Sequence, residues 1–489
     1  MIDLDHLEKY RENNRIEAKK AIGGLPNSIW ETYSAFANTL GGIILLGVEE
    51  YKDKSLHAID LPNPTYLIKE FWKIINDTDR VSMNILTEKD VQPETVNGKS
   101  IVVIRVPRAE RTDKPIYIDG DPIKGSYRRN GDGDCHCTKD EVEAMLRDAT
   151  GRSQDMLVLE NMGLYVFDYD SVHRYRRRMR NSRPGHAWED LEDNDFLYKL
   201  GAVSRGNDGR LYPTVAGLLM FGYEYEIVKE FPDYFLDYQE QLDDSTRRSV
   251  RIVSSSGDWS GNVYDFYFKV YDRIAQDIKT PFKTKDGERI DDTPIHTALR
   301  EALANCIINA DYYGRQGLVI IKKRDTITFS NPGNFRIDVE AAKSGGVSDP
   351  RNITLIKMFN LINIGERSGS GIPNIYRVWD KQGWEAPVIT EDFEPQRITL
   401  SLSVLTDNKV TDNKKVMVKR IDKNKLADIR KNIIIEYLTD HVNAKSSELA
   451  KLLGVRSARI KRLLSELVED GIAVAEGTNR DRTYRLREK

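Results

Sequence analysis

The pattern of apolar and polar positions predicts a mixed α/β unit in residues 1–150. Residues 15–19 (RIEAK) alternate between polar and apolar side chains, which is typical of a short strand. Apolar residues then recur at helical spacing up to a Gly-Gly pair at 41–42, where we expect that helix to end. The aliphatic runs at 43–48 and 100–108 predict two buried strands.

A helix closes this unit, and the pattern then becomes less regular. Residues 138–149 are predicted to be helical, with a capping box formed by Thr138 and Glu141. Residues 213–222 predict another helix that ends at a glycine. We therefore expect the region 151–260 to be a connecting α/β domain.

The rest of the chain predicts a further domain, a linker and a small tail. Residues 261–404 combine a helix, strands and several glycine-rich loops. Residues 405–427 are rich in Lys, Asn and Asp and contain a near-duplication, which indicates a linker. Residues 428–489 read as three helices followed by a hairpin, the order of a winged helix-turn-helix. The expected fold class is α/β multidomain.

Composition supports several domains and an ordinary globular protein. The chain has 489 residues and is therefore too long for one hydrophobic core. Of its residues, 39% are hydrophobic and 31% are charged, as in an ordinary globular protein. The net charge of −3 means that affinity for nucleic acid has to come from local patches. Three cysteines are too few for a disulfide framework, and no apolar run approaches the roughly 20 residues that span a bilayer. We expect a cytoplasmic protein without a membrane partner.

Cations gather on the third predicted helix of the tail. This group comprises Arg456, Arg459, Lys461 and Arg462. Cations at the start of a recognition helix can reach phosphates and base edges in a major groove. A solvated helix face or a protein-docking module would show the same pattern. Duplex binding is therefore one hypothesis among three.

A second polar pattern lies on the predicted helix within 294–314. Glu301, Asn305 and Asn309 recur every four residues and form a stripe that contains neither Lys nor Arg. A solvent-facing helix normally mixes charges, so this stripe is typical of a face turned towards a ligand. A glutamate can deprotonate or orient a water molecule, and an asparagine oxygen can hold Mg²⁺.

The segment REALANCIINADYY resembles the N-box helix of the ATP-binding fold shared by gyrase and histidine kinases (GHKL), with its Glu-x-x-x-Asn motif. Downstream, ITFSNPGNF stands where that fold places the loop that contacts adenine. VSDPRN and IGERSGSGIPNIYRVW resemble the later loops and lid of its divergent branch. The resemblance covers roughly residues 290 to 400 and implies a GHKL-like α/β sandwich.

This resemblance implies a site for ATP or another nucleotide, with Glu301 as general base and Asn305 as a Mg²⁺ ligand. Asn331 stands where the family usually has Asp, and an amide can both accept from and donate to a base. Folds of this type often act as dimers, so we expect a homo-oligomer. A scaffold without nucleotide is the alternative. The expected nucleotide-binding residues are Asn305, Asn309, Asn331, Gly333, Gly369 and Gly371.

The pattern ENNRIEAKK, followed by AFANTLGGIILLGVEE, resembles the AlbA-type domain of the Schlafen group. GSYRRNGDGDCHCTKDEVEAML fits the closing strand and helix of that domain. The likeness covers roughly residues 10 to 147. Some members of the group are metal-dependent endoribonucleases that use three carboxylates, and others are known only as DNA-binding regulators.

Carried over to this chain, the three acids are Glu12, Glu17 and Glu49, with Glu50 as the rival for the third place. Clustered carboxylates can hold Mg²⁺ or Mn²⁺, which activates water and neutralises developing phosphate charge. If the acids are only surface residues, the domain is a binding module. The expected contacts to a nucleic-acid backbone are Lys19, Lys20, Arg128 and Arg129.

Three classes of function are consistent with these features. Our leading interpretation is a nucleotide-responsive protein that binds DNA or RNA, in the manner of a transcriptional regulator. The alternative is a Schlafen-like metal-dependent endoribonuclease, for example one that acts as an effector of phage defence. The third class is a scaffold that works by binding other proteins. The chain has no GxxxxGK[ST] loop, which argues against a helicase motor.

Overall fold

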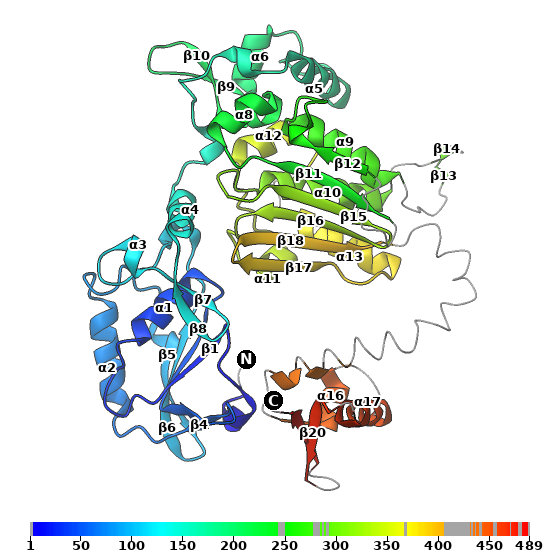
Figure 1. Ribbon diagram of the computed structural model, residues 1–489. Helices are drawn as coiled ribbons and strands as arrows, with labels where there is room; N and C mark the ends of the chain where they lie inside the picture. Colours follow the sequence, from blue (N-terminus) through cyan, green and yellow to red (C-terminus); the bar gives the residue numbers. More distant parts are fainter. Residues whose placement is uncertain are drawn as a thin grey trace. The chain divides into compact units, whose positions relative to one another are not determined.

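In this computed structural model the described residues are 3–242, 250–276, 284–285, 288–289, 293–365, 369–404, 431, 434–435, 437–439, 443–452, 457–469, 471–477 and 482–487. They divide into two compact units (Figure 1). The first comprises the described residues of 1–109, 113–142 and 415–489, and the second those of 110–112 and 143–414. The expected linker, 405–427, lies outside the described residues.

The N-terminal part of the first unit is built on a four-stranded sheet. Its strand order is β1-β2-β6-β5, with β1 parallel to β2 and the other neighbours antiparallel. Two small hairpins, β3-β4 and β7-β8, complete it. The elements are β1 (Ile16–Lys19), α1 (Ile29–Asn38), β2 (Gly42–Leu46), β3 (Val48–Glu50), β4 (Leu56–Ala58), α2 (Pro64–Ile75), β5 (Val91–Val96), β6 (Lys99–Val106), α3 (Pro122–Gly125), β7 (Tyr127–Asn130), β8 (Gly133–His136) and α4 (Lys139–Ala149).

Helix α1 is the centre of this domain, because nearly all of its side chains are buried. Trp30, Tyr33 and Phe36 are at most 2% exposed. The predicted Gly-Gly break follows it for a steric reason. Gly41 has φ +72°, and a Cβ there would lie 2.8 Å from the carbonyl oxygen of Val106. The chain can therefore turn into β2 against β6 only with glycine at this position.

The predicted closing helix is confirmed as α4, and its capping box is present. The Thr138 backbone N–H donates to Glu141 Oε2 at 2.6 Å, and the Glu141 N–H donates to Thr138 Oγ1 at 3.3 Å. The division between the two units falls within this helix, between Val142 and Glu143.

The second unit contains the largest sheet, with strand order β12-β11-β15-β16-β18-β17. β11 and β15 are parallel, and the other neighbours are antiparallel. Its elements are α5 (Tyr169–Ser182), α6 (Asp193–Leu200), β9 (Val203–Arg205), β10 (Leu211–Pro213), α7 (Val215–Phe221), α8 (Glu224–Glu230), β11 (Leu236–Gln241), β12 (Val250–Val253), α9 (Val263–Ala275), β13 (Thr284–Lys285), β14 (Glu288–Arg289), α10 (Pro294–Ile308), β15 (Leu318–Lys323), β16 (Thr326–Pro332), α11 (Val339–Ser344), α12 (Ile353–Leu361), α13 (Gly371–Gln382), β17 (Val388–Phe393) and β18 (Gln396–Ser403).

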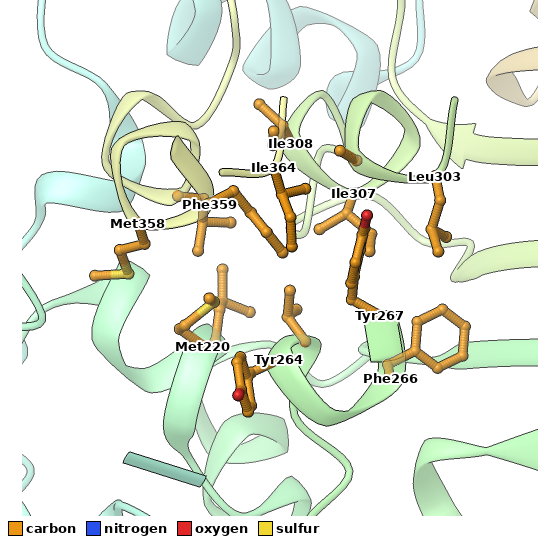
Figure 2. Packing of buried hydrophobic residues seen from close by; sticks show 14 of the residues in the cluster. Met220, Tyr264, Phe266, Tyr267, Leu303, Ile307, Ile308, Met358, Phe359 and Ile364 are labelled. Atoms are coloured by element: carbon orange, nitrogen blue, oxygen red, sulfur yellow. The ribbon is translucent and has the colours of Figure 1, made fainter. Parts of the chain in front are cut away.

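One hydrophobic core joins this unit from Leu159 to Val404. Helix α10 packs against β16 and between α9 and α13. Figure 2 shows part of this core, where Tyr267 of α9 lies beside Ile307 of α10, with Phe359 of α12 nearby. The helices and sheet of the expected α/β sandwich are therefore in contact through one packed interior.

The expected domain boundary at residue 260 does not coincide with a break in this structure. β11 and β12 precede it, yet they form one edge of the same sheet as β15–β18. The reason is that β11 pairs in parallel with β15 across more than 70 residues of sequence, a contact that local periodicity does not reveal.

The tail forms a small packed module. Its described elements are β19 (Ala444–Lys445), α16 (Ser446–Leu452), α17 (Ser457–Glu469), β20 (Ala473–Glu476) and β21 (Thr483–Leu486), and the sheet order is β19-β21-β20. Its core includes Ile434, Leu449, Leu464 and Tyr484. Among the described residues of the whole chain, no helix is both long and apolar enough to cross a membrane.

Candidate functional site

A cavity lies beside α10 in the second unit, between its helices and the large sheet. It holds about 1120 Å³ of empty space, part of it open to solvent. The floor is apolar, formed by sheet residues, and the polar groups come from α10, from the loops that follow β16 and α11, and from the start of α13. The predicted residues that line it are Glu301, Asn305, Asn309, Asn331, Gly369 and Gly371.

The polar stripe of α10 forms one wall of this cavity. Between positions 301 and 310, every residue is buried except Glu301, Asn305 and Asn309, which are half-buried. Asn305 Nδ2 donates to Glu301 Oε1 at 3.3 Å, and Asn309 Nδ2 donates to the Asn305 carbonyl at 3.0 Å. The stripe is thus a connected polar row on a helix that otherwise packs into the core.

The glycine loop before α13 approaches this row closely. A Cβ at Gly371 would lie 2.1 Å from Glu301 Oε1, so only glycine leaves the carboxylate where it is. Gly369 has φ +68°, and a Cβ there would lie 2.6 Å from the Val347 carbonyl. The first turn of α13 has backbone N–H groups without helical partners, a feature that favours anions.

The sheet side of the cavity contains Asn331 among apolar residues. This residue is 4% exposed and lies opposite Ile398 in the β16–β18 ladder. Its Nδ2 donates to the Pro332 carbonyl at 3.2 Å. Apolar walls beside one buried amide suit a flat ring with polar edges.

Gly333 is the predicted residue that the cavity does not include. A Cβ at Gly333 would instead lie 3.0 Å from Arg351 Nη2, so this glycine makes room for a buried arginine. Arg351 in turn donates from Nε to the Asn309 carbonyl at 3.2 Å. Gly333 therefore affects the cavity only indirectly, because it leaves room for Arg351, which holds the Asn309 carbonyl.

Sequence reasoning missed two arginines of the cavity wall, Arg336 and Arg351. Both side chains are 8% exposed, and both pair with Asp148 at the end of α4. The sequence predicts VSDPRN only as a loop, through its resemblance to the ATP-binding fold, and a buried arginine in a loop leaves no periodic pattern. Their partner lies about 200 residues earlier in the sequence, so only the fold reveals the cluster.

The cavity offers oxygen ligands for a divalent ion from Glu301 and Asn305. The part of the chain that the structure describes contains no group of three or more His, Cys, Asp or Glu side chains placed to hold a metal ion. Mg²⁺ is commonly bound by one or two protein oxygens, with substrate phosphates and water completing its shell. The donor set here fits an ion that arrives with a nucleotide.

The carboxylates of the N-terminal domain form a second candidate group. Burial raises the pKa of Glu12, and the negative charges of Glu17 and Glu50 raise it further. The Ala18 N–H, which donates to Glu12 Oε1 at 3.0 Å, acts in the opposite direction. Glu17 and Glu50 are therefore each near enough to Glu12 for their negative charge to act on its carboxylate.

Glu49, the predicted third acid, is paired elsewhere. Lys20 Nζ lies 2.5 Å from Glu49 Oε1, whereas Glu50 pairs with Lys54 at 3.0 Å. Successive residues of a strand point to opposite faces, so β3 cannot turn both acids towards Glu12. The charge that reaches Glu12 is that of Glu50, the rival candidate.

The expected backbone-binding cations differ in their accessibility. Arg128 and Arg129 are 7% and 5% exposed, and their guanidinium groups pair with Glu141 at 3.1 Å and Glu17 at 2.7 Å. The Lys19 side chain is 12% exposed and pairs with Glu17, whereas that of Lys20 is 61% exposed. Of these four, the structure leaves Lys20 open to a ligand, because burial of the others fixes them inside the domain.

The tail cations are only partly described. Lys461 and Arg462 are exposed on α17, and Arg462 Nε lies 3.2 Å from Glu466 Oε1. Arg456 and the side chain of Arg459 lie outside the described residues. The predicted basic surface therefore stays a prediction.

Comparison with known families identifies three segments of the chain. Residues 12–138 match the family described as "Schlafen, AlbA_2". Residues 318–400 match "Putative ATP-dependent DNA helicase recG C-terminal", an ATPase-like (HATPase_c_4) family, and residues 143–237 match a domain of unknown function, DUF8451. A search of curated proteins finds no match.

Solved structures that are similar to the chain include the following two. The DIP2311 protein from Corynebacterium diphtheriae is 16% identical, with a TM-score of 0.40, over 97% of this chain and 92% of its own. The N-terminal domain of a putative ATP-dependent DNA helicase RecG-related protein from Nitrosomonas europaea is 35% identical, with a TM-score of 0.22, over 28% of this chain and 90% of its own.

These matches confirm the two domain types expected from the sequence motifs. The chain carries a Schlafen-type AlbA_2 domain and an ATPase-like domain of the recG-related type, in a multidomain α/β architecture.

Proposed function

We propose that the protein is a nucleotide-responsive regulator that binds nucleic acid through its AlbA_2 domain and its tail. The observation that carries the proposal is the cavity beside α10. It brings together Glu301, Asn305, Asn309, Asn331 and the glycine loop from positions up to 70 residues apart. Three separate sequence motifs thus converge on one pocket, which has an apolar face formed by the sheet and polar groups from α10 and the loops.

In this proposal each wall of the cavity has its own role. The apolar floor and Asn331 bind the base. Glu301, which lies against the glycine loop, orients or deprotonates a water molecule, and Asn305 offers an oxygen to Mg²⁺. A bound Mg²⁺ would neutralise phosphate charge. The backbone of the glycine loop and the first turn of α13 would face the phosphates.

Nucleotide binding is tested by equilibrium dialysis of the full chain with labelled ATP, with and without Mg²⁺. We expect saturable binding that Mg²⁺ strengthens, and a loss of the Mg²⁺ effect in Asn305→Ala. Asn207→Ala is the matched control, because Asn207 is exposed and lies outside the cavity in the same unit. Absence of binding, or an equal effect of both variants, would refute the assignment.

Nucleic-acid binding is supported by the AlbA_2 match and by the exposed cations on α17 of the tail. Lys461 and Arg462 of α17 are exposed, as a recognition helix requires. A salt titration of the full chain on duplex DNA and on RNA, each with and without ATP, tests this part. We expect affinity to fall steeply with salt and to change with ATP. Salt-independent binding would contradict it.

A metal-dependent endoribonuclease is the second candidate. The observation that favours it is that the negative charges of Glu17 and Glu50 both act on the half-buried Glu12, although the described residues contain no group of three acids already placed to hold a metal ion. Carboxylates that the fold keeps close together repel one another, and a bound divalent cation relieves this repulsion. Incubation of the protein with tRNA and Mn²⁺ tests this candidate. Glu12→Gln should abolish cleavage, while Glu49→Gln, the neighbouring acid that pairs with Lys20, should retain it. Equal cleavage by wild type and Glu12→Gln would exclude the nuclease.

A further inference from the structure

The loop that follows β16 carries two buried polar atoms without a hydrogen-bond partner in the described part of the chain. They are Asn334 Oδ1 and Arg336 Nε, an acceptor and a donor two residues apart. Both residues line the cavity, and the Arg336 side chain is only 8% exposed. Buried polar groups in proteins are nearly always paired. This acceptor and this donor are therefore suited to bind a ligand that carries a donor and an acceptor of its own.

The remaining atoms of the Arg336 guanidinium are held in place. Nη1 donates to the Pro350 carbonyl at 3.0 Å, and Nη2 donates to the Asp148 carbonyl at 3.2 Å. The carboxylate oxygen nearest to Nε is Asp148 Oδ1 at 3.7 Å, beyond hydrogen-bond distance, and that oxygen is already bonded by Arg351 Nη1. The guanidinium is therefore fixed at both terminal nitrogens, and its Nε–H has no hydrogen-bond partner among the described residues.

The charges around Arg336 also favour an anion. Linked ion pairs gather three guanidinium groups and two carboxylates, a formal excess of one positive charge. Burial lowers the pKa of Arg336, and Arg351 and Arg111 lower it further, while Asp148 and Asp349 oppose them. A negative group beside Arg336 would balance the cluster. The members are Arg111, Arg336, Arg351, Asp148 and Asp349.

The same wall connects Arg336 with the glycine loop. Asp349 Oδ1 lies 3.8 Å from Arg336 Nη1. Two residues earlier, the Val347 carbonyl is the atom that a Cβ at Gly369 would meet. A chain of phosphates could therefore contact Arg336 and the backbone at Gly369 in one bound molecule.

We propose that the loop from Asn334 to Arg336 seats the sugar–phosphate part of the cavity's ligand, with Arg336 binding an oxyanion and Asn334 Oδ1 accepting from a sugar hydroxyl. A nucleoside phosphate supplies both groups, whereas inorganic phosphate lacks the hydroxyl donor on a sugar and a free nucleoside lacks the anion. The inference deepens the proposed nucleotide site and rests on it. It adds residues that the motif resemblance does not include.

A ligand series on the wild-type protein gives the first test. Affinities for ATP, AMP, adenosine, 2′,3′-dideoxy-ATP and tripolyphosphate are compared by calorimetry at one salt concentration. We expect AMP to bind at least about tenfold more tightly than adenosine, because one charge-assisted hydrogen bond contributes about that gain in affinity. We also expect ATP to bind more tightly than its dideoxy analogue. Adenosine that binds as tightly as AMP would overturn the inference.

Variants give the second test, with folding checked by circular dichroism. Arg336→Gln should weaken the binding of ATP about 10- to 100-fold and leave the affinity for adenosine unchanged. Arg336→Lys should recover part of the lost ATP affinity. Asn334→Ala should abolish the preference for ATP over dideoxy-ATP. Arg324→Gln, at an exposed loop arginine of the same unit, is the control.

The outcomes separate the two claims. If the wild-type protein binds ATP but folded Arg336→Gln binds it equally well, this inference fails and the proposed function stands. If the wild-type protein binds no nucleotide, both fail. Should Arg336→Gln not fold, the ligand series on the wild-type protein alone decides.

Discussion

Glu17 and Arg129 form an ion pair inside the AlbA_2 domain, with Arg129 Nη2 2.7 Å from Glu17 Oε2. The Arg129 side chain is 1% exposed, and its Nη1 also pairs with Asp134 at 2.8 Å. Lys19 approaches Glu17 Oε1 at 2.9 Å. Glu17 therefore neutralises buried positive charge inside the domain, in addition to any contact that it makes with a ligand.

Replacement of Glu17 by alanine should destabilise the domain. It would leave Arg129 buried with one carboxylate partner fewer, and breaking a buried pair in this way typically costs about 3–5 kcal/mol. Chemical denaturation measures the effect. Glu49→Ala is the control, because Glu49 pairs with the exposed Lys20, and such a surface pair contributes about 0–1 kcal/mol. An equally small loss in Glu17→Ala would show that the buried pair is not stabilising. Loss of nuclease activity in Glu17→Ala alone would not identify a catalytic residue.

Glu12 predicts a specific dependence of stability on pH. Burial and the charges of Glu17 and Glu50 raise its pKa above the usual 4.5, so the folded protein binds the proton more tightly than the unfolded chain. The stability contributed by this proton is fully present below pH 4.5 and is lost as pH rises through the higher folded pKa. Glu12→Gln should therefore increase Tm at neutral pH, with a gain that disappears towards pH 4. A gain that is the same at all pH values would contradict the assignment.

Much of the cavity was predictable because its residues follow a local rule. Glu301, Asn305 and Asn309 stand out as polar positions at helical spacing on an otherwise apolar helix. Glu50 was not distinguishable from Glu49, since the sequence does not tell which face of a three-residue strand turns inward. Arg336 and Arg351 depend on Asp148, a partner that only the fold brings close. Periodic features were thus predicted, and features set by long-range contacts were not.

Gly371→Ala should impair the nucleotide site without unfolding the protein. The added Cβ would meet the end of the Glu301 side chain at 2.1 Å, and a flexible side chain can move aside. The displaced carboxylate would lose its bond with Asn305 and its place beside the glycine loop. We expect Mg²⁺-dependent ATP affinity to fall about tenfold, the value of one charge-assisted contact. Gly151→Ala, where a Cβ meets nothing within 4 Å, is the control. Unchanged affinity in Gly371→Ala would place the ligand away from Glu301.

Asp148 links the end of α4 to the cavity wall, and its replacement should affect both stability and ligand binding. Burial alone would lower the pKa of Arg351. The negative charges of Asp148, Asp311 and Asp349 have the larger combined effect and raise this pKa. Asp148→Asn removes the carboxylate that Arg351 Nη1 contacts, which should cost about 3–5 kcal/mol for a pair this deeply buried.

Arg351 also donates to the Asn309 carbonyl at 3.2 Å, so a loosened Arg351 should disturb the polar stripe of α10. We therefore expect Asp148→Asn to lower Tm and to weaken ATP binding together. Glu340→Gln is the control, because Glu340 pairs with Lys343 on the surface with its side chain 77% exposed. Such a pair contributes about 0–1 kcal/mol. Calorimetric unfolding and ATP titration of the same samples measure both effects. A lower Tm with unchanged ATP affinity would show that the stripe keeps its geometry without Arg351.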